Sequence, residues 1–202
     1  MLGMEVNDEI RALKNAWNEL VNLIHYENKA SRRDNKEGDL SKLYFVCWQE
    51  ADVSFQLGRL FYRGLTEKDV HFHVEVNLKS SNFNDYDFAK QNGLQGVKKA
   101  LGRIPRVDFL ISNDFSDRID IIGEAKYFRY SVDRWRRTPK EDIKKDWDKL
   151  KAFRDNEVCE KVVYVVLDKY YHYQKEQKNL KEIKAELQKM KRDGITTLFE
   201  EV

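Results

Sequence analysis

The sequence has little cysteine and no long apolar run. Its 202 residues include two cysteines, Cys47 and Cys159, which lie far apart and form no C-x-x-C pair. A zinc site or a disulfide framework is therefore disfavoured, and buried free thiols are expected. No stretch of about eighteen apolar residues occurs, and the N-terminus lacks a signal-peptide core. We therefore expect a cytoplasmic protein that makes no contact with a membrane.

Two further absences narrow the possible functions. The chain has no G-x-x-x-x-G-K-[ST] loop, which disfavours a nucleotide-hydrolysing enzyme. It also has almost no excess of either charge, since 37 lysines and arginines oppose 35 acidic residues for a net charge of +2. The net charge therefore does not indicate a partner. A hydrophobic content of 41% and this length fit one globular domain covering residues 1–202.

Hydrophobic periodicity predicts alternating helices and strands. Helices are expected near residues 6–26, 42–64, 139–154 and 174–192, and strands near 70–78, 106–112, 119–126, 161–167 and 195–199. A polar run at 27–39 is expected to end the first helix, and a long polar connection is expected at 79–104. The order predicts an α/β fold with a small mixed β-sheet flanked by helices. Its parts would be an N-terminal helical extension at about 1–40, a core at about 41–168 and a C-terminal helix at about 174–192.

Three charged residues interrupt two of the predicted apolar strands. Asp108 lies in one strand, and Glu124 and Lys126 lie in the next. Side chains alternate along a strand, so Glu124 and Lys126 must emerge on the same face. An ionised group on a buried face costs several kcal/mol unless it is paired or binds a metal. Two carboxylates on adjoining strands would suit Mg²⁺, which keeps several waters and takes one or two protein carboxylates.

These residues resemble the motif of the PD-(D/E)XK nuclease superfamily, over roughly residues 41–168. The resemblance makes Asp108 and Glu124 the two acids and Lys126 the lysine, with the backbone carbonyl of Ala125 as a further metal ligand. Val107 replaces the family's proline, although Pro105 lies nearby. The implied fold is restriction-endonuclease-like, and the implied function is that of a nuclease, either an endonuclease or an exonuclease. DNA is the favoured substrate and Mg²⁺ the metal, with Mn²⁺ expected to substitute.

The resemblance also implies how the site would work. Magnesium would activate a water and neutralise charge on the phosphate. Lys126 would orient that water or help to deprotonate it, and its protonation state stays open because the metal and the carboxylates act on it in opposite directions. Neither a serine nor a cysteine nucleophile is proposed. The predicted helix after Lys126 has no Q-x-x-x-Y pattern, so a RecB-like assignment is weak.

A fourth acid is expected to support this site. Glu50 falls in phase with the apolar stripe of the predicted helix at 42–64. Members of the superfamily commonly carry a glutamate on the helix before the core sheet, and Glu50 resembles it, both as a catalytic residue and as a metal ligand. Glu75, on the predicted strand at 70–78, competes for the same role. Glu50 could instead reach solvent or form a helix-surface pair with an arginine, and Glu75 could be a solvated strand residue.

Two basic segments are candidates for holding a nucleic acid. The first follows Lys126 and mixes cations with aromatic rings that could stack on bases. Its candidates are Arg129, Arg134, Trp135, Arg136 and Arg137. The second is the long polar connection, whose glycines Gly93 and Gly96 would allow a phosphate to approach the backbone. Its candidates are Lys98, Lys99 and Arg103. Either segment could also be a solvated basic loop.

Three other interpretations stay open at this point. Asp108 or Glu124 could simply form a cross-strand ion pair with Lys126. A non-catalytic nucleic-acid-binding or assembly module on the same fold is the main functional alternative, since fold does not fix function. A structural protein that docks through its Lys/Glu-rich closing helix is the third. A homodimer is possible for an enzyme that cuts both strands of a duplex, because one site cuts one strand.

Overall fold

The architecture was obtained as a computed structural model. It describes residues 6–34, 50–65, 70–78, 88–113, 119–128, 139–168 and 177–201. Within these ranges the chain forms five helices and five strands. No helix in the described part is both long enough and apolar enough to cross a membrane.

The five strands form one mixed sheet in the order β1-β2-β3-β4-β5. The strands are β1 (Val70–Val76), β2 (Val107–Asn113), β3 (Ile119–Phe128), β4 (Cys159–Asp168) and β5 (Thr196–Glu201). The first three pair antiparallel, whereas β3–β4 and β4–β5 pair parallel. The mixed sheet predicted from the sequence is confirmed.

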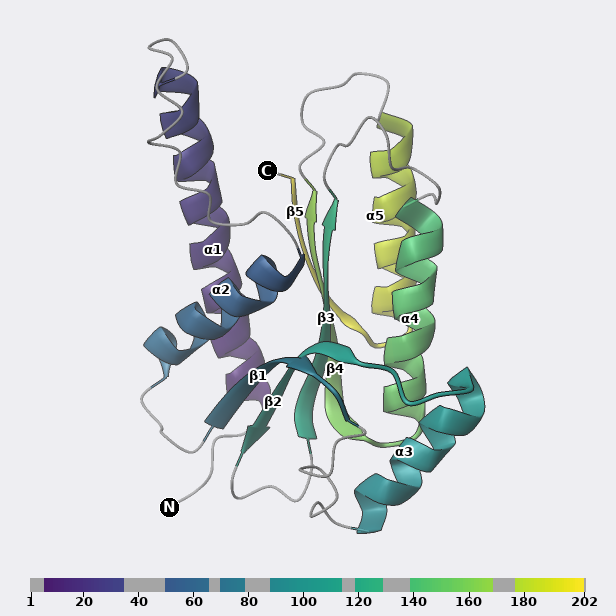
Figure 1. Ribbon diagram of the computed structural model, residues 1–202. Helices are drawn as coiled ribbons and strands as arrows, with labels where there is room; N and C mark the ends of the chain where they lie inside the picture. The colour runs from purple at the N-terminus through teal and green to yellow at the C-terminus, as the bar shows by residue number, and fades with distance from the viewer. Residues whose placement is uncertain are drawn as a thin grey trace.

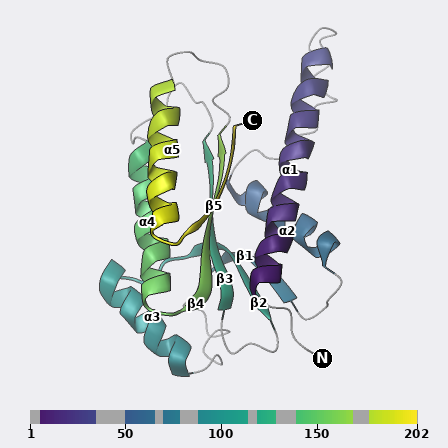
Figure 2. The same ribbon diagram turned by 180° about the vertical axis from the view of Figure 1, so that it is seen from behind.

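Helices cover both faces of this sheet (Figure 1). One layer contains α1 (Val6–Asp34) and α2 (Glu50–Gly64), and the other contains α3 (Phe88–Leu101), α4 (Pro139–Asp155) and α5 (Gln177–Arg192). The view from behind shows α1 and α2 on the opposite side of the sheet from α4 and α5 (Figure 2). Each layer has its own apolar core. The sheet therefore separates two hydrophobic clusters.

The buried stripes explain most of the predicted elements. In α2, the apolar residues Val53, Leu57, Leu60 and Phe61 are buried as their periodicity predicts. Strand β4 is buried continuously from Val162 to Asp168, which confirms a strand covered on both faces. After α5, Gly194 has a φ of +78°, the left-handed conformation that glycine adopts readily at the end of a helix. The part of the second predicted helix before Glu50, including Cys47, lies outside the described residues.

Both predicted polar connections contain more helix than expected. The run at 27–39 does contain the end of the first helix, but the helix continues into it as far as Asp34. Its residues up to that point include no glycine or proline, and a polar composition alone does not stop a helix. The connection at 79–104 contains α3, and Gly93 and Gly96 lie inside that helix. A Cβ atom on either glycine would collide with Asn156, so these glycines permit close packing beside the end of α4.

Gly123 shows a similar close approach within the sheet. It pairs with Phe109 across β2 and β3, and a Cβ atom at this position would overlap the Phe109 ring. Phe109 in turn stacks on Phe72 of β1, with 5.2 Å between the ring centroids. The absence of a side chain at Gly123 therefore allows this aromatic stack to form on the face of the sheet that α1 and α2 cover.

A buried carboxyl group lies in the first turn of α1. Glu9 is 0% exposed, and neither of its carboxyl oxygens has a hydrogen-bond partner. Burial, together with the nearby Asp120, raises the pKa of Glu9 to about 8. Burial disfavours the charged form of a carboxyl group, so Glu9 is protonated at neutral pH.

Replacing Glu9 with glutamine should therefore change how stability depends on pH. The folded chain holds a proton on Glu9 more tightly than the unfolded chain does, so this residue lowers stability progressively as pH rises from about 4.5 to about 8. We expect the free energy of unfolding of Glu9→Gln, relative to the native protein, to increase by roughly 1 kcal/mol per pH unit across that window. Urea unfolding at pH 5.5, 7 and 8.5 would measure it, and a constant difference would contradict it.

Candidate active site

The candidate site begins with a row of polar side chains across three strands. Phe109 pairs with Gly123, which places Asp108 opposite Glu124 one position further along the ladder. Glu124 in turn pairs with Tyr164 on β4. Residues directly opposite each other point to the same face of a sheet. Asp108, Glu124 and Tyr164 therefore form a row on the face that α4 covers.

Asp108 is fixed by the backbone of the neighbouring strand. Its Oδ2 atom accepts a hydrogen bond from the backbone N–H of Ala125 at 2.9 Å. The carboxylate is thereby oriented toward the stretch of β3 that carries Glu124 and Lys126. The predicted meeting of Asp108 with Glu124-Ala125-Lys126 is present in the structure.

The end of β3 brings the two helical layers together. Strand β2 begins at Val107, whereas β3 continues to Phe128. By the ladder register, Lys126 lies beyond the start of β2. Its Nζ atom contacts Oε1 of Glu50 at 2.9 Å and Oδ2 of Asp146 at 3.5 Å. Glu50 comes from α2 and Asp146 from α4, so Lys126 links the opposite layers at this point.

Glu124 has a different cationic partner. The ammonium group of Lys149, on α4, forms an ion pair with Oε2 of Glu124. Lys149 also donates a hydrogen bond to the backbone carbonyl of Arg106 at 3.2 Å. The two lysines thus pair with different acids. Lys126 forms ion pairs with Glu50 and Asp146, and Lys149 forms one with Glu124.

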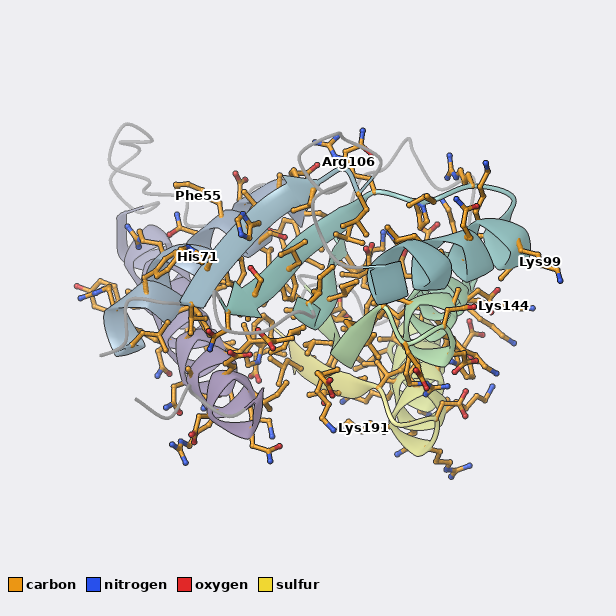
Figure 3. All side chains as sticks on the ribbon, turned by 90° about the horizontal axis from the view of Figure 1, so that it is seen from below. Phe55, His71, Lys99, Arg106, Lys144 and Lys191 are labelled. Carbon is orange, nitrogen blue, oxygen red and sulfur yellow. The ribbon has the colours of Figure 1, made fainter. Side chains whose placement is uncertain are left out.

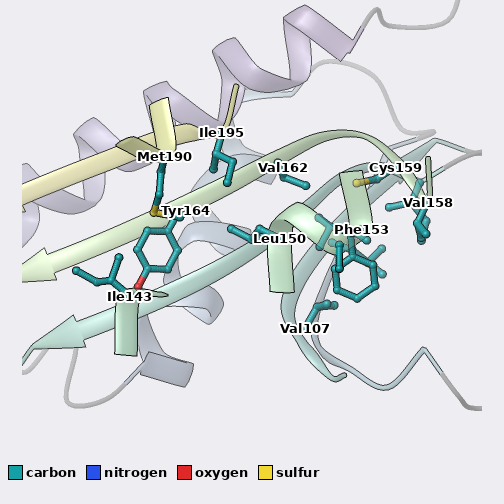
Figure 4. Close-up of a cluster of buried hydrophobic side chains, with 14 of the residues drawn as sticks. Val107, Ile143, Leu150, Phe153, Val158, Cys159, Val162, Tyr164, Met190 and Ile195 are labelled. Carbon is teal, nitrogen blue, oxygen red and sulfur yellow. The ribbon is translucent and has the colours of Figure 1, made fainter. Parts of the chain in front are cut away.

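Tyr164 connects this polar group to the apolar core. It is fully buried among the side chains of the α4–α5 layer (Figure 4). Its hydroxyl donates a hydrogen bond to Oδ2 of Asp146 at 3.2 Å. Burial, with Asp146 beside it, raises the pKa of Tyr164 well above its ordinary value. Tyr164 therefore stays protonated and acts as a donor that holds Asp146 in place.

Burial controls the protonation of the acids in the site. Glu124 is 2% exposed, and burial followed by the charge of Asp108 raises its pKa well above the ordinary value, despite Lys149. Burial also raises the pKa of Glu50 and of Asp146, and Lys126 only partly offsets it. The two lysines thus do not fully offset the cost of burying these carboxylates.

Lys126 is affected in the opposite sense. Burial disfavours its charged form, but Asp146 and Glu50 outweigh burial and raise the pKa of Lys126 above its ordinary value. The residue is therefore an ammonium ion at neutral pH in this arrangement. The charges of the chain itself therefore favour the ammonium form.

The fit of these residues to a metal ion can be judged from their oxygens. Within the described residues, no group of three or more His, Cys, Asp or Glu side chains is placed to hold a metal. The resemblance implies the carboxylates of Asp108, Glu124 and Glu50 with the carbonyl of Ala125. Glu50 contacts Lys126 instead, which leaves Asp108, Glu124 and the Ala125 carbonyl as the donors. Oε1 of Glu124 is buried and has no hydrogen-bond partner. A buried carboxylate oxygen without a donor, beside a second carboxylate, fits a small divalent cation.

The structure also bears on the alternatives for single residues. The contacts of Lys126 are with Glu50 and Asp146, so the simple pair with Asp108 or Glu124 is not the arrangement found. Glu75, the competitor of Glu50, forms an ion pair with Arg106 at 3.0 Å on the exposed side of β1. Glu50 is thus the acid that reaches the site. Cys159 is a buried free thiol, as expected.

The expected nucleic-acid contacts are only partly described. Arg129, Arg134, Trp135, Arg136 and Arg137 lie outside the described residues. The other three candidates lie at the end of α3 or just after it. Lys98 and Lys99 are exposed in the last turn of the helix. Arg103 is exposed beyond the helix and lines a cleft beside α4.

A cleft of about 930 Å³ leads to the site. Its walls are the connection from α3 to β2 and the outward side of α4, and Asp108, Asp146 and Lys149 line it where it meets the site. Its basic residues are Arg103, Arg106, Lys144, Lys145 and Lys149. Lys144 projects from the α3–α4 side of the molecule, whereas Lys191 projects from α5 (Figure 3).

Sequence reasoning missed Asp146, Lys149 and Tyr164. A usable signal was present for Asp146. It lies three residues after Ile143 and four before Leu150, both fully buried, so a charged residue occupies the buried stripe of α4. Lys149, three residues after Asp146, follows the same side of the helix. The Tyr164–Glu124 pairing could not be foreseen, because it depends on the register of two strands far apart in sequence.

Comparisons of the chain with protein-family models, with curated proteins and with solved structures found no match. The resemblance to the PD-(D/E)XK superfamily therefore rests on the motif residues, their positions on β2 and β3 and the order of the elements.

Replacing Lys126 with methionine should make stability more sensitive to pH. Glu50 and Asp146 would lose their cation, and their pKa values, already raised, would rise further. Acids with raised pKa values lower stability as pH increases through that range. We expect the drop in unfolding free energy between pH 5 and pH 8 to exceed that of the native protein by about 1 kcal/mol or more.

Lys161→Met is the matched control, because Lys161 is an exposed lysine on the adjacent strand β4. Urea unfolding of the three proteins at both pH values would measure the difference. Parallel pH profiles for Lys126→Met and the native protein would show that Lys126 does not neutralise these acids.

Proposed function

We propose that this protein is a metal-dependent nuclease of the PD-(D/E)XK type, built on a restriction-endonuclease-like fold. The observation that carries the proposal is the placement of Asp108 and Glu124 side by side, with Oε1 of Glu124 buried and without a partner. Lys126 follows two positions along the same strand, in the order the motif requires. The element order α2, β1, β2, β3, α4, β4 supports the same assignment, with α3 as an insertion.

The metal would be Mg²⁺, held by Asp108, Glu124 and the carbonyl of Ala125, with Mn²⁺ expected to substitute. When bound, it would supply charge neutralisation at the phosphate and activation of water. The chain prepares this site through the Ala125 N–H, which orients Asp108. Because Oε1 of Glu124 lacks a donor, an incoming cation does not have to displace a hydrogen bond from that oxygen.

Lys126 would contribute positive charge to the reaction. Its ammonium is held between Glu50 and Asp146, and its raised pKa keeps it protonated. In this state it can donate a hydrogen bond to a water or a phosphate oxygen, but it cannot accept a proton. Glu50 would then act as a positioning acid for Lys126, and Tyr164 would position Asp146 in turn.

DNA is the favoured substrate, by the resemblance alone. The resemblance is also the basis for expecting an endonuclease or an exonuclease, and for considering a homodimer that cuts both strands. They remain predictions that product analysis and sedimentation would test.

A specific observation also favours the non-catalytic alternative. Lys149 forms an ion pair with Glu124, so one of the two acids already has a cation from the chain itself. If Lys149 stays there permanently, a metal has only Asp108 and a single oxygen of Glu124 to bind. The protein would then bind nucleic acid without cutting it, and binding would survive both chelation and loss of Lys126.

The decisive experiment measures cutting and its dependence on metal. Purified protein is incubated with supercoiled plasmid, single-stranded DNA and RNA, in Mg²⁺, Mn²⁺ or chelator. We expect cutting in Mg²⁺ and Mn²⁺ and none in chelator. We expect Lys126→Ala and Asp108→Asn to lose at least a hundredfold in rate, because Lys126 would act on the water or the phosphate and Asp108 would hold the metal.

Lys161→Ala serves as the control for removal of a lysine, and unfolding profiles verify the fold of each variant. Metal-dependent cutting that persists in pure Lys126→Ala would refute the proposed mechanism. Absence of cutting by the native protein, with Mn²⁺ unbound by titration, would refute the nuclease and make the non-catalytic module the leading interpretation.

A further inference from the structure

We propose that the cleft between the α3–β2 connection and α4 binds the phosphate backbone of a nucleic acid, without reading its bases, and leads that backbone to Asp108. This inference rests on the proposed function and adds the route and the mode of substrate binding. Of the basic residues in this cleft, sequence reasoning had considered Arg103 and Arg106 but not Lys144, Lys145 or Lys149.

The first observation concerns charge on the two walls of the cleft. Arg103 lies on the α3–β2 wall, and Lys144 and Lys145 lie on the α4 wall. All three are exposed. Among the residues that the structure describes, none of the three has an ion-pair or hydrogen-bond partner, so their charges face the solvent of the cleft. Cations on both walls suit a polyanion lying between them.

The other charged groups of the lining are largely engaged. Arg106 pairs with Glu75, Lys149 with Glu124 and Asp146 with Lys126. Glu141 also has a partner. Asp148 is the exposed acid of the α4 wall, and it opposes the binding of an anion. Asp108, where the cleft meets the site, accepts a backbone N–H but has no ion-pair partner among the described residues. Away from that end, three cations without partners against Asp148 leave the solvent-facing part of the cleft positive.

The second observation is the chemical character of the lining. Besides the charged residues, it contains Asn77, Leu101, Ile104 and Pro105 and no aromatic ring among the described residues. Proteins that hold bases in single strands use aromatic side chains for stacking, and those that read sequence use side chains placed against base edges. Lysines and an arginine on opposite walls instead match phosphates. Binding should therefore depend little on sequence.

The third observation is where the cleft ends. Asp108 lies in its lining, together with Asp146 and Lys149 of the candidate site. Lys149 contacts both this lining and Glu124. A phosphate held between the walls would therefore meet Lys149 next to the paired acids Asp108 and Glu124. The cleft and the site form one continuous path.

The test measures binding in chelator, so that no cutting can occur. Fluorescence anisotropy follows the binding of labelled duplex DNA of about 20 base pairs in two unrelated sequences, with RNA and single-stranded DNA as further probes. The variants are the double replacement Lys144→Ala/Lys145→Ala and the single replacement Arg103→Ala. The control is Lys181→Ala/Lys191→Ala, which removes two exposed lysines of α5 outside the cleft.

We expect the native protein to bind both duplexes within about twofold of each other, since bases are not read. The Lys144→Ala/Lys145→Ala variant should bind roughly tenfold more weakly. Its plot of log affinity against log salt should be shallower by about 2, because each phosphate contact contributes about 0.9 to that slope. Arg103→Ala should lower the slope by about 1, and the α5 control should match the native protein.

An equal loss of binding affinity in the cleft variant and the α5 control would overturn the inference, since binding would then depend on the overall charge of the protein and not on the cleft. Unchanged binding by Lys144→Ala/Lys145→Ala, strong preference for one duplex sequence, or no binding to any of the probes would overturn it as well. A cleft variant that binds normally while the native protein cuts would refute the cleft and leave the nuclease standing. If the native protein cuts nothing but the cleft variant binds more weakly than it does, the cleft proposal stands and the nuclease proposal is refuted.

Discussion

The arrangement of this protein depends on two carboxylates forced together inside a sheet. Asp108 and Glu124 face each other across β2 and β3, and the burial of Glu124 makes its charge costly. Such a pair is stable only if cations or protons compensate it. Lys149 supplies a cation from α4, and the N–H of Ala125 holds Asp108. Even so, one oxygen of Glu124 is left without a donor. That residual demand for positive charge is the physical basis of the proposed metal site.

The offset between two strands determines which residues can reach this point. Because β3 continues past the start of β2, Lys126 is accessible from both helical layers. Glu50 reaches it from α2 and Asp146 from α4. Tyr164 ties Asp146 to the apolar core, so the position of the lysine depends on packing in that layer. The catalytic geometry proposed here would therefore respond to core substitutions that touch neither substrate nor metal.

Sequence reasoning succeeded where periodicity or strand alternation carried the information. The five strands and the helices α2, α4 and α5 follow from apolar spacing, and the joint position of Glu124 and Lys126 follows from alternation. It failed where polar composition was read as irregular structure, because α1 runs on to Asp34 and α3 lies inside a presumed connection. Gly93 and Gly96 were misread for the same reason. Two glycines three residues apart can let a helix pack closely against Asn156, and the same spacing occurs in loops that approach a phosphate. The spacing alone does not distinguish the two.

The sequence by itself determined the chemical inventory of the site. Asp108, Glu124, Lys126 and Glu50 were identifiable because charged groups stand out in apolar strands and helical stripes, where burial makes them costly. Only the tertiary structure decided how those charges pair. In the folded chain, Lys126 forms ion pairs with Glu50 and Asp146, and Glu124 forms an ion pair with Lys149. Pairing depends on strand register and on how α4 lies on the sheet. These are long-range properties, and the spacing of residues along one element contains no record of them.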